Sequence, residues 1–168
     1  MDNIKSQRLI MRKGQLSDSF FILMLLNQPC FYENIADKGI YTRDKAEDYI
    51  QNAFINSHKI NGFGPYIVTL EDSTPIGMVG LFKRDYIHFP DIGYAFLSQY
   101  TGKGYATDAC EQLLHHVQSR FQMIAAITST GNSASQQILK KLGFSKAADI
   151  IASPDKQPIS LYIRGSSC

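Results

Sequence analysis

The chain has 168 residues, of which 44% are hydrophobic and 19% charged, and its net charge is +2. This length predicts one domain spanning residues 1–168, and the composition excludes disordered, fibrous and coiled-coil proteins. Because no run of like charges occurs, nucleic acid is not expected as a partner. The most apolar stretch, Phe20 to Leu26, is too short to cross a membrane, so no membrane partner is expected either.

The cysteines indicate the cellular compartment. Cys30, Cys110 and Cys168 are an odd number at unrelated spacings, which is typical of free thiols in a reducing environment. No small-x-small cleavage site follows the basic N-terminal residues, so export is not expected and the predicted location is cytoplasmic. No metal site is expected, because adjacent helical residues point about 100° apart and His115 and His116 cannot share one ion.

The N-terminal part of the chain predicts one strand followed by two helices. The strand is expected over residues 7–13. Ser17 is a suitable N-cap for a strongly apolar helix over Asp18 to Asn27. Thr42 can cap the second helix, whose apolar stripe extends from Ala46 to Phe54.

Three β-rich runs separated by short turns then indicate an antiparallel meander: Tyr66–Glu71, Ile76–Arg84 and Ile92–Ser98. Apolar residues recur at helical spacing from Ala106 to Val117, and a short apolar strand follows over Met123–Thr128, which predicts a β-α-β crossover. A last helix from Ser133 ends at Gly143, and strands over 144–151 and 158–163 follow. The predicted fold class is therefore α/β (α+β), with a mixed, mostly antiparallel central sheet flanked by helices.

A glycine turn lies where the third meander strand ends and the next helix begins. In the segment QYTGKGYA, Gly102 and Gly104 flank Lys103. Without Cβ atoms the backbone can turn sharply and approach a ligand, while the free amides and dipole of a helix N-terminus favour phosphate. The segment predicts a pyrophosphate site, although a turn that needs glycine only for its dihedral angles remains the alternative.

Two nucleotide-binding motifs are disfavoured at this turn. No Gly-Lys-Ser/Thr ends the segment, which excludes a Walker loop and ATP hydrolysis. A dinucleotide fingerprint needs a third Gly or Ala where Thr107 stands, and an acidic residue about 20 positions on. Phe121 to Gly131 contains no Asp or Glu, which argues against NAD binding.

The pattern Gln-x-x-Gly-x-Gly, from Gln99 to Gly104, resembles the coenzyme A pyrophosphate loop of the GNAT N-acetyltransferases. Other segments agree in the same order: RLIMR, GFGPYIV, PIGMVGL, DIGYAFLSQYTGKGYATDA and NSASQQILKKLGF. Together they resemble the branch that acetylates the N-termini of ribosomal proteins, over residues 8 to 144. The resemblance implies the GNAT-like acyl-CoA N-acyltransferase fold and an acetyl-CoA-dependent N-acetyltransferase.

The resemblance also implies where acetyl-CoA binds. In the family its pantetheine arm hydrogen-bonds the edge of a strand at a splayed strand pair, and backbone amides of the glycine turn hold the pyrophosphate. The residues so assigned are Tyr94, Ala95, Phe96, Leu97, Gln99, Thr101, Gly102, Lys103, Gly104, Tyr105, Ala106, Thr107, Asn132 and Ser135. Asn132 and Ser135 are also common helix-capping types, so capping remains open for both.

Acetyl transfer to an amine is aminolysis of a thioester, which needs a base and a proton for the leaving thiolate. Many family members place a tyrosine four residues after the position of Ser135, where this sequence has Leu139. Ser135 is therefore the candidate proton donor, with water as the alternative. Asp91, at the start of its predicted strand, is the candidate base acting through water, because burial would raise its pKa. An exposed carboxylate at a strand end is the alternative for Asp91.

In this resemblance the acceptor is recognised by the loop from Phe31 to Tyr41 and by the final strands. The candidate contacts for a cationic amine are Tyr32, Glu33, Asp37 and Tyr41, with a solvated loop as the alternative. The predicted partners are acetyl-CoA and a primary amine, either a protein N-terminus or a small molecule, bound by a monomer or homodimer. Leu139 keeps open a catalytically weak CoA-binding regulatory module, and the glycine loop alone would also suit a nicotinamide-dependent enzyme.

Overall fold

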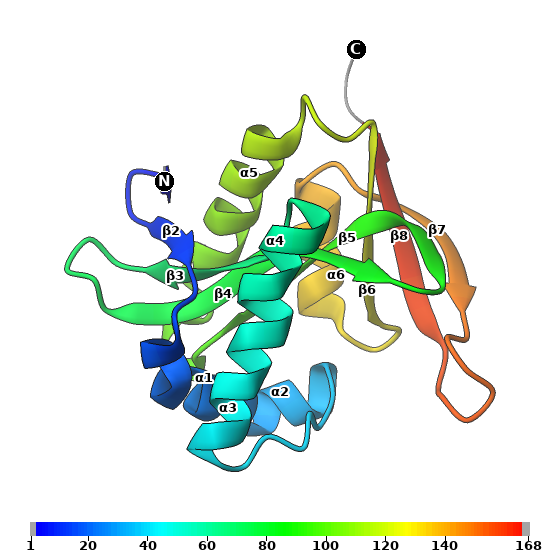
Figure 1. Cartoon of the computed structure of the whole chain (residues 1–168). Coiled ribbons are helices and arrows are strands. Elements are labelled where there is room, and N and C mark those ends of the chain that lie inside the picture. The colour runs from blue at the N-terminus through cyan, green and yellow to red at the C-terminus, as the bar shows by residue number, and fades with distance from the viewer. Residues whose placement is uncertain (1–2, 166–168) are drawn as a thin grey trace.

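The computed structural model describes residues 3–165, whose strands form one eight-stranded sheet (Figure 1). The strands are β1 (Ile4–Lys5), β2 (Ile10–Lys13), β3 (Pro65–Thr69), β4 (Pro75–Arg84), β5 (Ile87–Phe96), β6 (Met123–Ser129), β7 (Ser145–Ile150) and β8 (Ile159–Gly165). Their order in the sheet is β1-β2-β3-β4-β5-β6-β8-β7. Among these strands of residues 3–165, only β5 and β6 pair in parallel, which confirms the predicted mixed, mostly antiparallel sheet and its β-α-β crossover.

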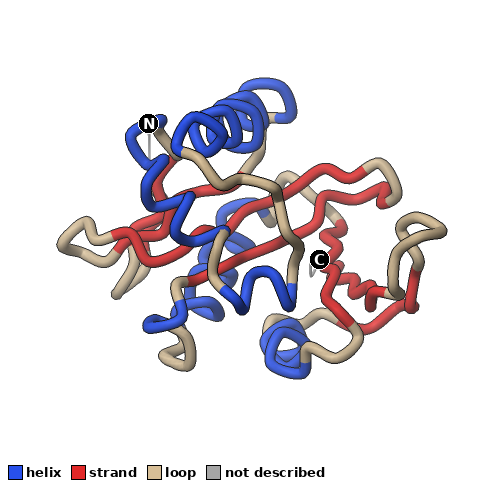
Figure 2. Tube along the Cα trace, turned by 90° about the horizontal axis from the view of Figure 1, so that it is seen from below, coloured by secondary structure: helices blue, strands red, loops and turns tan. Residues whose placement is uncertain are grey.

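Helices cover both faces of the sheet (Figure 2). They are α1 (Ser19–Leu26), α2 (Pro29–Asn34), α3 (Arg43–Tyr49), α4 (Ser57–Asn61), α5 (Tyr105–Val117) and α6 (Ser133–Lys141). A π-helical segment, Ile50–Asn56, joins α3 to α4, so that all three form one continuous rod in front of the sheet in Figure 1. Helices α5 and α6 lie behind the sheet in that view.

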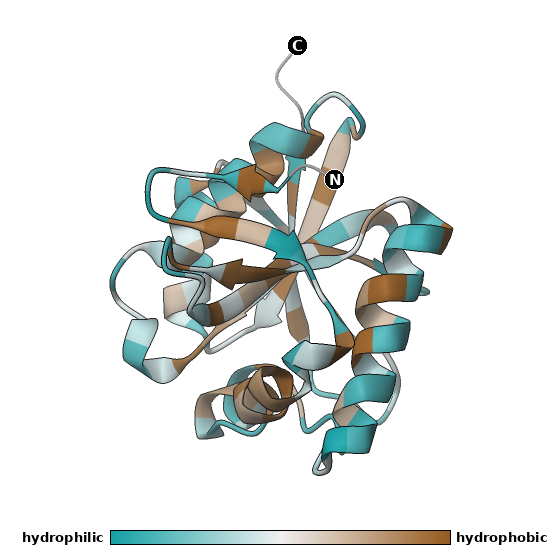
Figure 3. Ribbon diagram, turned by 60° about the vertical axis from the view of Figure 1, so that its left-hand side comes forward, coloured by the Kyte–Doolittle hydropathy of each residue, from teal (hydrophilic) through white to brown (hydrophobic). Residues whose placement is uncertain are grey.

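Two buried cores follow from this arrangement, one on each face. Successive residues of a strand point to opposite faces, so Val79 of β4 packs in the core under α5 whereas Met78 packs in the core under α1 and α3. Because both faces are covered, β4 reads as an almost continuous apolar run. Helix α1 is likewise apolar over most of its length, as Figure 3 shows at the bottom of the view.

The start of the first helix differs from its prediction. A short 3₁₀ turn, Leu16–Asp18, precedes α1, so Ser17 lies within that turn and is not the N-cap. The carboxylate of Asp18 accepts a hydrogen bond from the Gln15 amide at 2.8 Å and forms an ion pair with Arg12. These two contacts close the turn before α1 begins. Capping preferences of single residues could not predict this ion pair.

Two elements and one strand boundary also differ from the predictions. Strand β1 and helix α2 were not predicted, and Pro29 occupies the first turn of α2, where its missing N–H has no cost. Strand β5 begins at Ile87 rather than Ile92 because its first half pairs with the end of β4 around an irregular hairpin. The helix capped by Thr42 is confirmed, since its hydroxyl oxygen accepts from the Lys45 amide at 3.3 Å.

Within residues 3–165, no helix combines the length and the apolar character needed to span a bilayer. In the same range, no group of three or more His, Cys, Asp or Glu side chains is placed to hold a metal ion. Cys30 and Cys110 are free thiols, and Cys168 lies outside the described residues.

Candidate active site

Strands β5 and β6 run side by side only briefly. Parallel pairing joins them at two positions, Asp91 with Ala125 and Ile92 with Ala126. Beyond this point β5 continues to Phe96 beside β4, and β6 continues beside β8, so each strand stays anchored on its far side. The edge of β5 beyond Ile92 therefore has no strand partner toward β6 among the described residues. Its backbone donors and acceptors can bind an extended ligand.

The glycine turn lies directly at the end of this free edge. A 3₁₀ turn over Ser98–Tyr100 leads into Gly102 and Gly104, whose φ angles of 74° and 79° explain why both positions are glycine. Gly104 is the N-cap of α5 and provides no side-chain hydrogen bond to the helix. A Cβ at Gly102 would meet no atom within 4 Å. The start of α5 thus combines free amides, a favourable dipole and open space, which suits an anion.

Two hydroxyl groups, one from β5 and one from α6, are hydrogen-bonded to each other. The side chain of Asn132 caps α6 by accepting from the Ser135 amide at 3.1 Å, and the hydroxyl of Tyr94 donates to Ser135 Oγ at 3.1 Å. Burial raises the pKa of Tyr94 to about 12, so the phenol stays protonated at neutral pH. Leu139, in contrast, is only 1% exposed and belongs to the core, so it has no part in this pair.

Asp91 is buried at the point where β5 and β6 separate. It lies inside β5 rather than at its start, is 1% exposed, and accepts a hydrogen bond from Arg84 Nε at 2.8 Å. Its second oxygen, Oδ2, is buried without a hydrogen-bond partner among the described residues. Burial raises the pKa of Asp91, and the positive charge of Arg84 opposes that rise. The exposed strand-end alternative is therefore wrong.

A family description, the acetyltransferase (GNAT) domain, matches residues 8–145 of the chain. This match covers the free strand edge, the glycine turn and the Tyr94–Ser135 pair. The chain belongs to the GNAT family. Members of this family use acetyl-CoA as acetyl donor, and the uncapped helix start and unpaired strand edge fit such a molecule.

Individual GNAT proteins resemble the chain along most of its length. It is 26% identical over 144 residues to the uncharacterized N-acetyltransferase YnaD of Bacillus subtilis (strain 168), covering 84% of this chain and 81% of YnaD. The solved structure of RimL, a ribosomal L7/L12 α-N-protein acetyltransferase in complex with coenzyme A, has a TM-score of 0.84 at 17% identity, covering 98% of each chain. A spermidine N-acetyltransferase SpeG chimera from Vibrio cholerae and hSSAT has a TM-score of 0.77 at 19% identity, covering 96% of each chain. The fold is shared by GNAT enzymes named for different amines.

The other residues predicted to bind acetyl-CoA lie along the edge and the turn. The side chains of Phe96 and Leu97 are buried in opposite cores, so only their backbone can meet a ligand. Thr101 uses its hydroxyl locally, donating to the Ser98 carbonyl at 2.8 Å. Lys103 is exposed, with its ammonium group 5.6 Å from the centre of the Tyr100 ring. The residues still predicted as cofactor contacts through backbone or exposed side chain are Ala95, Gln99, Tyr105, Ala106 and Thr107.

The four predicted acceptor contacts lie on α2 and the loop after it, and all are exposed. Tyr32 donates its hydroxyl to Asn27, and Tyr41 donates to Asp37. The hydrogen bonds from Tyr41 and from the Gly39 amide lower the pKa of Asp37, so this carboxylate is ionised at neutral pH. The structure joins Asp37 with Tyr41 and joins Tyr32 to Asn27, the C-cap of α1, while Glu33 stays a solvent-exposed candidate.

Gln28 is a structural link that local patterns did not indicate. Its side-chain oxygen accepts from both the amide and the hydroxyl of Ser98, each at 2.7 Å, and its nitrogen donates to the Phe96 carbonyl at 3.4 Å. The residue thus fixes the start of α2 against the end of β5. Glutamine between two helices has no distinctive spacing, so only the folded contact reveals this function.

Proposed function

We propose that the chain transfers the acetyl group of acetyl-CoA to a primary amine, on a protein N-terminus or a small molecule, by direct aminolysis. The observation that carries the proposal is the unpaired edge of β5 leading into the uncapped glycine turn of α5. An extended pantetheine arm can hydrogen-bond that edge like an added strand, and its pyrophosphate then reaches the free amides of the turn. The thioester lies near the point where β5 and β6 separate.

The base in this proposal is Asp91. Most amines are protonated at neutral pH, so a proton must leave before nitrogen can attack the thioester carbonyl. Arg84 holds Oδ1 of Asp91 and leaves Oδ2 as the acceptor that can take this proton through a water molecule. The burial that raises the pKa of Asp91 also makes it a stronger base than an exposed carboxylate.

The proton for the departing sulfur comes from the Tyr94–Ser135 pair. When the C–S bond breaks, the thiolate takes the proton of Ser135 Oγ, and Tyr94 can pass its own proton to that oxygen. A hydrogen bond received from Tyr94 makes the serine hydroxyl a stronger donor than it would be alone. The pair therefore replaces the tyrosine that would stand at Leu139.

The test is a thiol-release assay of the full chain with acetyl-CoA and a panel of N-terminal peptides, polyamines and amino acids. Acetyl transfer predicts CoA release that depends on one class of amine, with the acetylated product confirmed by mass spectrometry. The Asp91→Asn variant is the matched control, since it keeps the size and most hydrogen-bonding atoms of Asp91 but cannot act as the base. CoA binding without release across the panel would favour a regulatory module instead.

A further inference from the structure

Arg8 contacts the glycine turn from outside the proposed site. It lies between β1 and β2, about a hundred residues before the turn. Its Nη1 donates to the Lys103 carbonyl at 2.9 Å, and its Nε donates to Asp108 Oδ2 at 3.4 Å. The guanidinium also stacks 4.8 Å from the centre of the Tyr105 ring. One side chain thus joins the residue between the two glycines to the first turn of α5.

The contact with the Lys103 carbonyl determines the direction in which the Gly104 N–H points. In a planar trans peptide, the carbonyl of one residue and the N–H of the next point in opposite directions. Because Arg8 holds the Lys103 carbonyl, the N–H of Gly104 is directed away from Arg8. Glycines on both sides of Lys103 would otherwise let this peptide rotate, since they accept a wide range of dihedral angles.

Arg8 also lies in close contact with the turn itself. A surface cavity of about 570 Å³ is lined by Arg8, Gly104, Thr107 and Lys141, and also by the carboxylates of Asp108 and Glu111. Nη2 of Arg8 lies 3.4 Å from the position that a Cβ of Gly104 would take. The guanidinium therefore lies directly against the turn, with its charge paired to Asp108, so its effect on a ligand is through the shape of the turn.

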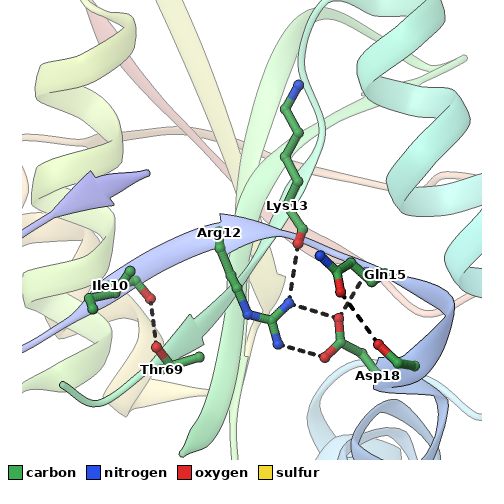
Figure 4. A network of polar contacts seen from close by, with 7 residues as sticks. Ile10, Arg12, Lys13, Gln15, Asp18 and Thr69 are labelled. Carbon is green, nitrogen blue, oxygen red and sulfur yellow. Dashed lines mark hydrogen bonds and ion pairs between the residues drawn. The ribbon is translucent and has the colours of Figure 1, made fainter. Parts of the chain in front are cut away.

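Arg12 offers an internal comparison, because it belongs to the same RLIMR segment. Its guanidinium binds both oxygens of Asp18, at 2.9 and 2.6 Å, and donates to the Lys13 carbonyl at 3.2 Å (Figure 4). This network connects β2 to the start of α1 and does not include the glycine turn. Arg8, in contrast, is 48% exposed, and half-exposed ion pairs add little to folding stability. Of the two arginines in this segment, Arg12 therefore joins β2 to α1, whereas Arg8 contacts the glycine turn.

We propose that Arg8 is a positioning residue for acetyl-CoA, which holds the glycine turn in its anion-binding conformation through the Lys103 carbonyl and Asp108. The inference rests on the proposed function, since it assumes that the turn binds the pyrophosphate. Arg8 has no part in the chemistry of the thioester in this proposal. Its loss should weaken donor binding and leave the chemical step intact.

The experiment measures CoA affinity by calorimetry and steady-state kinetics for Arg8→Gln, Arg8→Lys and the control Arg43→Gln. Arg43 is also a surface arginine paired through Nε, with Glu47 at 3.1 Å, but it lies on α3 away from the turn. Arg8→Gln should raise the Kd for CoA and the KM for acetyl-CoA at least about fivefold, as expected for lost charge-assisted hydrogen bonds. Its kcat, its KM for the amine and its melting temperature should stay close to those of the wild type.

Arg8→Lys separates positioning from simple attraction. Lysine supplies the same charge, but its single nitrogen cannot reproduce the two-nitrogen contact with the carbonyl and the carboxylate. Arg8→Lys should therefore bind CoA as weakly as Arg8→Gln, and recovery of the wild-type Kd would overturn the proposal. So would an unchanged Kd in Arg8→Gln.

Binding of 3′-dephospho-CoA distinguishes positioning of the turn from direct contact with the 3′-phosphate of CoA. If Arg8 positions the turn, Arg8→Gln weakens CoA and 3′-dephospho-CoA by the same factor, because both carry the pyrophosphate. A loss confined to CoA would instead mean direct contact with the 3′-phosphate and would overturn the proposal. Absence of turnover with intact CoA binding would contradict the proposed function alone, since these affinities need no amine.

Discussion

At the scale of single residues, the proposed chemistry depends on two short contacts made from different elements. Tyr94 and Ser135 meet between β5 and α6, and Arg84 meets Asp91 between β4 and β5. Each contact leaves one group available: the serine proton in the first and Asp91 Oδ2 in the second. Asp91 lies where β5 leaves β6, and the Tyr94–Ser135 pair lies three residues further along β5; the acetyl group is proposed to lie between them.

Ser135→Ala should lower kcat by about tenfold or more, because the serine hydroxyl donates to sulfur more strongly as negative charge develops. Tyr94→Phe should give a smaller loss, since Ser135 keeps its own proton. Steady-state kinetics with calorimetry for CoA provide the measurement. Wild-type turnover in Ser135→Ala would leave the hydroxyl with only its structural contact to Tyr94, because Asn132 is the cap of α6.

Asp91→Asn should lower turnover by about 10²-fold or more, the usual contribution of general-base catalysis, while CoA affinity barely changes. The comparison is made at saturating acetyl-CoA across a range of pH. A small loss that high pH fully restores would mean that free amine is selected from solution. Asp91 would then serve only to anchor β5 through Arg84.

Arg84→Met should move the acidic limb of the rate profile to higher pH. A base acts when ionised, so this limb follows the pKa of Asp91, which burial raises and Arg84 holds down. Removing the guanidinium leaves burial unopposed, and the pKa of Asp91 rises further. Profiles of kcat/KM against pH for the wild type and the variant check the shift. An acidic limb at the same pH in both proteins would exclude Asp91 as the titrating group.

At the scale of elements, local patterns could predict segments whose signals are also local. The meander, the β-α-β crossover and the glycine turn follow from alternation, helical spacing and glycine at an element boundary. The predicted cap of α1 was wrong because Asp18, paired with Arg12, closes a turn before the helix. Helix α2 was not predicted because Pro29 also suits a loop. The Tyr94–Ser135 pair joins residues 41 positions apart, so no local pattern could reveal it.

Gly104→Val should abolish CoA binding without unfolding the chain. A branched side chain is strained at a φ of 79° and would crowd the amides that must approach phosphate. Gly39→Val is the matched control, since Gly39 has a φ of 65° and open space around its missing Cβ. Calorimetry with CoA should show binding by the control and not by Gly104→Val. Equal affinity of both variants would refute the assignment of the turn.

At the scale of the whole molecule, a ligand that joins β5 to the start of α5 should stabilise the folded chain. CoA at about 100 times its Kd is expected to add about 2.7 kcal/mol, which corresponds to an increase of about 5 to 10 °C in melting temperature at this size. Thermal unfolding with and without CoA measures the effect. No shift at millimolar CoA would contradict the proposed site.

The alternation of side chains along β5 has a consequence for kinetic order. Ile92 and Tyr94 pack in the core under α5, and Ala95 packs against the helices before β3. Strand alternation places Asp91 on the same side as Ala95. If acetyl-CoA and the amine bind as proposed, they approach β5 from its two sides, and neither has to leave before the other arrives. This geometry predicts a ternary complex, with initial-velocity lines that intersect when both substrates are varied. Parallel lines would instead indicate an acetylated enzyme intermediate.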